Sequence, residues 1–134
     1  MAKLEEIEGI GKKYAAMLAK TGVRGTGDLL KKGSTPEGRK TISAKSGITP
    51  KLILEWVNHV DLFRIKGVGS EYADLLEEAG VDTIPELAQR KADNLYQKMC
   101  DTNKAKKLVR KLPVEKQVAG WISQAKKLPR AITY

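Results

Sequence analysis

A short glycine-containing segment near the start of the chain combines residue types that bind an anion. Gly9, Ile10 and Gly11 are followed directly by Lys12 and Lys13. Glycines on both sides of an apolar residue let the backbone reverse tightly. The N–H groups at the start of a following helix then face the turn, where the helix dipole favours negative charge. Because two lysines add positive charge there, we expect these five residues to contact a phosphate group.

A second segment repeats the turn with a different charge. Gly67, Val68 and Gly69 are preceded by Lys66 and followed by Ser70. We expect these five residues to form a second phosphate contact. Acidic side chains follow closely and oppose a phosphate, namely Glu71, Asp74, Glu77 and Glu78. The sequence therefore predicts that the first segment is the stronger anion site.

The densest basic segment lies near the C-terminal end, and its candidate phosphate contacts are Lys104, Lys107, Arg110 and Lys111. Apolar residues between them predict a helix over 103–111 with one basic face. The net charge is +9, and residues 97–134 carry ten basic and two acidic side chains, against four and seven in residues 62–96. Positive charge without interleaved aromatic residues suits phosphate contact rather than base stacking.

Residues for catalysis or metal binding are sparse. His59 is the only histidine and Cys100 the only cysteine. No cluster at ligand spacing accompanies His59, and no activated nucleophile is present, so we expect no metal site, no cofactor and no enzyme activity.

A single cysteine excludes an internal disulfide and suits a reducing compartment. The chain is charged from Lys3 onward and has no apolar run near the ~20 residues that span a bilayer, so we expect a cytoplasmic protein without membrane association.

An internal repeat indicates how these segments are positioned. Residues 4–33 align with residues 62–91 at an offset of 58, and ten of the thirty columns are identical, mostly at glycine and apolar positions. The similarity resumes weakly around Trp56 and Trp121. Repeats of this kind mark supersecondary units. We therefore expect two tandem units, residues 1–61 and residues 62–134.

Start and stop signals predict that both units are helical. Thr35 and Thr49 each place a capping hydroxyl before a first-turn proline. Gly22, Gly47 and Gly80 are placed as left-handed helix ends. Strand-forming residues never alternate over a useful length. The chain is expected to be all-α, with helices near 3–7, 12–21, 36–46, 50–61, 70–79, 84–91, 93–101, 103–111 and 114–127.

The pattern I-x-G-I/V-G-x-x-Y-A-x-x-L occurs at residues 7–18 and 65–76. It resembles the helix-hairpin-helix superfamily, and the whole chain is similar to a family of tandem helix-hairpin-helix proteins without established function. The resemblance implies two tandem helix-hairpin-helix (SAM-like) units packed into one compact helical protein. Superfamily members grip the DNA backbone without reading sequence, and some bind a monovalent cation through hairpin carbonyls. It therefore implies phosphate contact at residues 9–13 and 67–70.

Two functions remain open from the sequence. The first is nucleic-acid binding without sequence preference, with DNA as the expected partner and RNA as its alternative. Lys12, Lys13 and the basic C-terminal region favour it. The second is a protein–protein interaction adaptor in which the hairpins are purely structural and the acidic face of residues 71–86 docks a protein partner. The acidic second hairpin favours this alternative.

Overall fold

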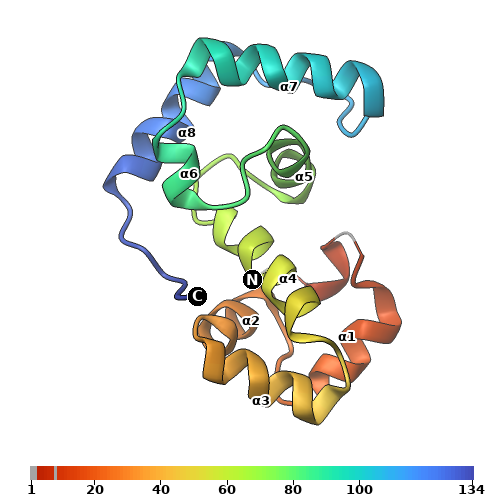
Figure 1. The fold of residues 1–134 in the computed structure, drawn as a ribbon. Coiled ribbons are helices and arrows are strands. Elements are labelled where there is room, and N and C mark those ends of the chain that lie inside the picture. Colours follow the sequence, from red (N-terminus) through yellow and green to blue (C-terminus); the bar gives the residue numbers. More distant parts are fainter. Residues whose placement is uncertain (1–2, 8) are drawn as a thin grey trace. The chain divides into compact units, whose positions relative to one another are not determined.

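The structure is a computed structural model that describes residues 3–7 and 9–134 (Figure 1). All regular elements in this part of the chain are helical, which confirms the predicted all-α class. The chain divides into two compact units. The first unit is Met1–Asp61 together with Ala131–Tyr134, and the second unit is Leu62–Arg130. The last four residues thus belong to the first unit.

The first unit contains a 3-10 turn and four helices: η1 (Leu4–Glu6), α1 (Gly11–Ala19), α2 (Thr26–Gly33), α3 (Pro36–Ser46) and α4 (Pro50–Leu62). Helix α1 packs on η1 and α3, and α2 packs on α3. The hydroxyl of Thr35 accepts a 3.1 Å hydrogen bond from the N–H of Gly38, and Gly47 ends α3 at a φ of 81°. Both ends of α3 are therefore fixed by the signals that predict them.

Helix α2 is an addition to the helices that the sequence predicts. Its eight residues include Gly27 and Gly33, which lower helix propensity. Leu29 in the middle of α2 is fully buried. Tertiary packing of a short segment, rather than a strong local signal, accounts for this helix.

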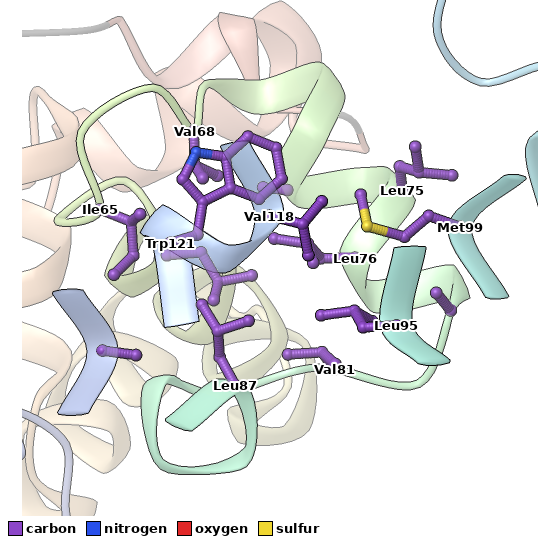
Figure 2. Packing of buried hydrophobic residues seen from close by; sticks show 14 of the residues in the cluster. Ile65, Val68, Leu75, Leu76, Val81, Leu87, Leu95, Met99, Val118 and Trp121 are labelled. Carbon is purple, nitrogen blue, oxygen red and sulfur yellow. The ribbon is translucent and has the colours of Figure 1, made fainter. Parts of the chain in front are cut away.

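The second unit contains α5 (Ser70–Glu78), α6 (Ile84–Ala88), α7 (Ala92–Lys106) and α8 (Glu115–Lys127). Helices α6 and α7 pack on α8, and α5 packs on α7. Figure 2 shows the core between them, which combines Val68 from the turn before α5 with Leu76 of α5, Met99 of α7 and Trp121 of α8. This core anchors the turn before α5.

The predicted helix at 93–101 is confirmed, whereas the predicted helix at 103–111 is wrong beyond residue 106. A single helix, α7, covers the first and the start of the second, and its C-cap is Lys107, the only non-glycine residue at positive φ in the described part of the chain. The side-chain amide of Asn103 accepts a 2.9 Å hydrogen bond from the N–H of Val109 and donates a 3.2 Å bond to its carbonyl. These bonds replace the helical ones, and buried Val109 anchors a non-helical connection over residues 107–114.

The same local hydrogen bonds recur in the repeated segments of the two units. The N–H of Ile7 donates to the carbonyl of Leu4 at 3.0 Å, and that of Ile65 donates to Leu62 at 3.1 Å. The helix ends match as well, since Gly22 and Gly80 have φ values of 90° and 97°. Several identical columns of the sequence repeat therefore correspond to shared turns, whereas Gly11 has a φ of 59° and its counterpart Gly69 has a φ of −100°.

In each unit a tryptophan packs on the hairpin helix, which is the helix that follows the glycine turn, α1 in the first unit and α5 in the second. The ring centroid of Trp56 lies 5.2 Å from that of Tyr14, and the ring centroid of Trp121 lies 5.4 Å from that of Tyr72. Both tryptophans are buried. Both are core residues, and each one joins a later helix of its unit, α4 or α8, to the helix that follows the glycine turn.

Candidate functional site

The turn before α5 depends on glycine at one of its two glycine positions. Gly67 has a φ of 95°, and a Cβ atom there would lie 3.1 Å from Nε1 of Trp121. Gly69 has a φ of −100° and is the extended N-cap of α5, so it does not use the left-handed conformation that glycine allows. Its carbonyl accepts the first helical bond from Ala73 at 2.9 Å. The turn needs left-handed backbone only at Gly67, because the N-cap position takes the β-region conformation open to any residue.

Helix α8 holds this turn in place through Gln124. The side-chain oxygen of Gln124 accepts a 2.8 Å hydrogen bond from the N–H of Lys66, and its amide group donates a 3.3 Å bond to the Lys66 carbonyl. The backbone N–H of Lys66 is thus used within the protein. The Lys66 side chain is exposed, so it can add charge near a ligand.

A cavity of about 410 Å³ lies at the N-terminal end of α5. We name it the hairpin cavity, and the residues that line it are Gly67, Gly69, Ser70, Glu71, Tyr72, Arg110 and Lys111. The hydroxyl of Tyr72 donates a 3.0 Å hydrogen bond to the backbone carbonyl of Lys111. The structure therefore brings together two predicted groups of site residues that are about forty positions apart in the sequence.

The hairpin cavity combines positive side chains with outward-facing amides. Arg110 and Lys111 are exposed and supply two positive charges, and Glu71 supplies one negative charge. The N–H groups of Glu71 and Tyr72 precede the first intrahelical bond of α5, so they face out of the helix end. This arrangement favours an anionic group and is weakened by Glu71.

The predicted basic segment is divided by the end of α7. Arg110 and Lys111 line the hairpin cavity, whereas Lys104 lies in the last turn of α7 and Lys107 caps it. Both of these lysines are exposed outside the cavity lining, and Lys106 pairs with Glu78. The sequence misses this division because residues 103–111 have a helical pattern that the Asn103 side chain interrupts.

The first hairpin has the predicted turn and a different source of charge. Gly9 and Gly11 have φ values of 90° and 59°, and the side chain of Ile10 is 2% exposed. Lys12 and Lys13 are exposed in the first turn of α1. Glu8, an acidic residue that directly precedes the glycine turn in the sequence, lies outside the described residues. In this unit the cations come from the hairpin helix itself.

A second basic hollow in the first unit was not predicted. Its volume is about 290 Å³, and its lining includes Lys32, Lys45, Thr21 and Thr41. Both threonine hydroxyls donate within their own helical segments, to the carbonyls of residues 18 and 37, so they offer only lone pairs to a ligand. The four residues come from three separate segments, and no local pattern in the sequence links them.

Comparison with known families gives a match over most of the chain. The family model described as a domain of unknown function (DUF4332) matches residues 8–128. No curated protein and no solved structure matches the chain significantly. No described helix is both long enough and apolar enough to cross a membrane.

Proposed function

We propose that this chain, which belongs to the family of the domain of unknown function DUF4332, binds nucleic acid without sequence preference, each unit acting as a helix-hairpin-helix module. The observation that carries the proposal is the hairpin cavity. There Arg110 and Lys111 lie at the same helix end as the turn over residues 67–69. A phosphate at that place would meet outward-facing amides and two cations together.

The chemistry of the hairpin cavity suits the nucleic-acid backbone rather than the bases. Tyr72 is half-buried, its ring lies against Trp121 and its hydroxyl is bonded to Lys111. Its ring and its hydroxyl are therefore both already engaged within the protein, which does not favour base stacking. Contacts of amides and cations with phosphates carry no sequence information. We take duplex DNA as the expected ligand, with RNA as the alternative that the titration below distinguishes.

The first hairpin supplies the second phosphate contact of the proposal. Lys12 and Lys13 stand at the start of α1, beside the turn through Gly9 and Gly11. Lys104 and Lys107 add positive charge outside the hairpin cavity. The proposal assigns no catalytic residue and no cofactor.

The test is a titration of a fluorescent 20-base-pair duplex at matched salt, repeated with single-stranded RNA. If four to six phosphates are neutralised, log K against log salt should slope by about −4 to −5. Arg110→Glu with Lys111→Glu, and Lys12→Glu with Lys13→Glu, should each weaken binding by about tenfold or more, because each reverses two charges. Lys91→Glu with Lys98→Glu is the control, since both residues are exposed and neither lines the hairpin cavity.

The results separate local contact from net charge. A loss confined to the two hairpin variants supports the proposal. Equal losses in all three variants would mean that only total charge matters. Absence of binding to DNA and RNA at low salt would remove the proposal.

One observation favours the adaptor alternative. Glu71 lies in the hairpin cavity itself, and Asp82 and Glu86 are exposed further along residues 71–86. A basic protein surface could use these carboxylates, whereas a phosphate could not. An adaptor would bind no nucleic acid at low salt, and charge reversal at Asp82 and Glu86 would abolish its capture of a basic protein.

A further inference from the structure

The last four residues of the chain are docked on the first unit as an extended segment. Ile132 is 1% exposed. The N–H of Thr133 donates a 2.8 Å hydrogen bond to the carbonyl of Ser34, and the Thr133 carbonyl accepts a 2.7 Å bond from Arg39. The hydroxyl of Tyr134 donates to Oδ1 of Asn58 at 3.0 Å. The first unit thus binds the N–H and the carbonyl of Thr133 and the side chain of Ile132, which is how proteins recognise extended peptides.

The slot that receives this segment is built by the first unit. Arg39 is 5% exposed, and its other guanidinium nitrogen donates a 2.8 Å bond to the carbonyl of Gly33 at the end of α2. A Cβ atom on Gly33 would lie 2.6 Å from Cγ2 of Val57, so α2 packs tightly on α4 behind the slot. The guanidinium is therefore held in place from within the unit, with one nitrogen directed at the docked segment.

The slot requires an occupant of definite chemistry. When the segment leaves, the guanidinium nitrogen loses the Thr133 carbonyl and must bond to water instead, so the slot favours an occupant that supplies the same acceptor. The occupant must supply a backbone carbonyl to Arg39, a backbone N–H to Ser34 and an apolar side chain to the position of Ile132. Residues 131–134 of this chain meet all three requirements.

All of these contacts are made by residues 131–134, which a short connection joins to the end of α8. Residues 128–130 join α8 to the docked segment, and the carbonyl of Pro129 accepts a 2.7 Å hydrogen bond from Arg64 in the second unit. The same four residues from another molecule would make the same contacts without any new complementarity. Exchange of an identical element at a short hinge is a low-cost route to a dimer.

We propose that the slot formed by Gly33, Ser34, Arg39 and Asn58 binds residues 131–134 of a second copy of this chain, so that two copies exchange these segments reciprocally. The intramolecular contact has an effective concentration in the millimolar range for a short linker. Exchange therefore becomes populated as the protein concentration approaches that range. The inference is independent of nucleic-acid binding.

Complementation between two defective full-length variants tests the exchange. Ile132→Asp spoils the segment and leaves the slot intact, whereas Arg39→Met spoils the slot and leaves the segment intact. Each variant alone should stay monomeric at about 0.5 mM by light scattering, because neither holds both halves of the contact. Their equimolar mixture should contain a 1:1 dimer. A mixture that remains monomeric while both variants are folded by circular dichroism overturns the proposal.

A peptide titration covers the case in which Arg39→Met fails to fold. A labelled peptide of residues 128–134 is added to full-length Ile132→Asp, whose slot is vacated, and to the parent. Binding to the variant should be at least tenfold tighter than to the parent, and the same peptide with aspartate in place of isoleucine should bind at least tenfold more weakly. Equal binding to both proteins, or none, overturns the proposal.

Discussion

The hydroxyl of Tyr72 donates a 3.0 Å hydrogen bond to the backbone carbonyl of Lys111. This bond joins the first turn of α5 to the non-helical connection over residues 107–114. Tyr72 also packs on Trp121, so one side chain links the core to the position of the cations. The position of the two cations in the hairpin cavity therefore depends on Tyr72, which the sequence shows only as a repeat position shared with Tyr14.

Tyr72→Phe should weaken nucleic-acid binding while the fold is kept. The phenyl ring retains the contact with Trp121, and the lost hydrogen bond should cost about 0.5–1.5 kcal/mol of unfolding free energy. Since Arg110 and Lys111 lose an anchor, affinity for duplex DNA should fall about two- to tenfold at fixed salt. Tyr14→Phe, at the equivalent position of the first unit, is the control and should leave affinity nearly unchanged. Equal effects of the two substitutions would contradict the prediction.

Glu71→Gln should strengthen binding. The substitution removes the one carboxylate from the hairpin cavity and keeps the side-chain shape. A single charge a few ångströms from a phosphate in a partly wet site is worth about 1 kcal/mol or more, so affinity should rise about fivefold. Asp82→Asn makes the same charge change at an exposed residue outside the cavity lining and should raise affinity much less. An unchanged affinity for Glu71→Gln would place the phosphate elsewhere.

Two glycine substitutions in the second unit should have opposite effects on stability. Gly67→Ala introduces a Cβ at a φ of 95° and 3.1 Å from Trp121, which should cost about 1–3 kcal/mol. Gly120 lies exposed within α8, and a Cβ atom there would meet no other part of the protein within 4 Å, so Gly120→Ala should stabilise by about 1 kcal/mol. Urea denaturation of both variants measures the difference. Similar midpoints for the two would contradict it.

The end of α7 offers a further pair of variants. Asn103→Ala removes both hydrogen bonds to Val109 and should destabilise by about 1–2 kcal/mol. Lys107→Gly removes the backbone strain of a lysine in the left-handed conformation, with a φ of 51°, and should stabilise the fold by up to about 1 kcal/mol. Thermal unfolding followed by circular dichroism checks both signs. A destabilised Lys107→Gly would show that the lysine side chain, rather than its backbone strain, governs this turn.

Local signals predicted much of the fold. Thr35 and Gly47 bound α3 because a capping hydroxyl and a left-handed glycine act on neighbouring residues alone. The prediction of a helix over residues 103–111 was wrong because the Asn103 side chain forms competing hydrogen bonds with Val109, six positions further along the chain. The periodic pattern of apolar residues there was real, but it reflects an anchored connection rather than a helix face.

The candidate site was only partly predictable for a related reason. The sequence identifies the turn at residues 67–70 and the cations Arg110 and Lys111 separately. The two groups line one cavity because the connection that follows α7 brings Arg110 and Lys111 back to Tyr72 in α5. This contact joins residues that are far apart in the sequence, so no local pattern predicts it. The predicted weakness of the second hairpin rested on Glu71 and its acidic neighbours. Arg110 and Lys111 add two positive charges at that hairpin, so its net charge is less negative than the local sequence around Glu71 indicates.

Each hairpin carries its own optical reporter. The chain has two tryptophans, and their ring centroids lie 5.2 Å and 5.4 Å from the ring centroid of one hairpin tyrosine in the same unit, with each indole nitrogen beside the first hairpin glycine. Trp56→Phe would leave fluorescence that reports on the second hairpin alone, and Trp121→Phe would leave fluorescence that reports on the first. Excitation energy absorbed by a tyrosine at that separation passes to its tryptophan. Emission from each single-tryptophan variant would therefore record, without an added label, when the corresponding hairpin opens or meets a ligand.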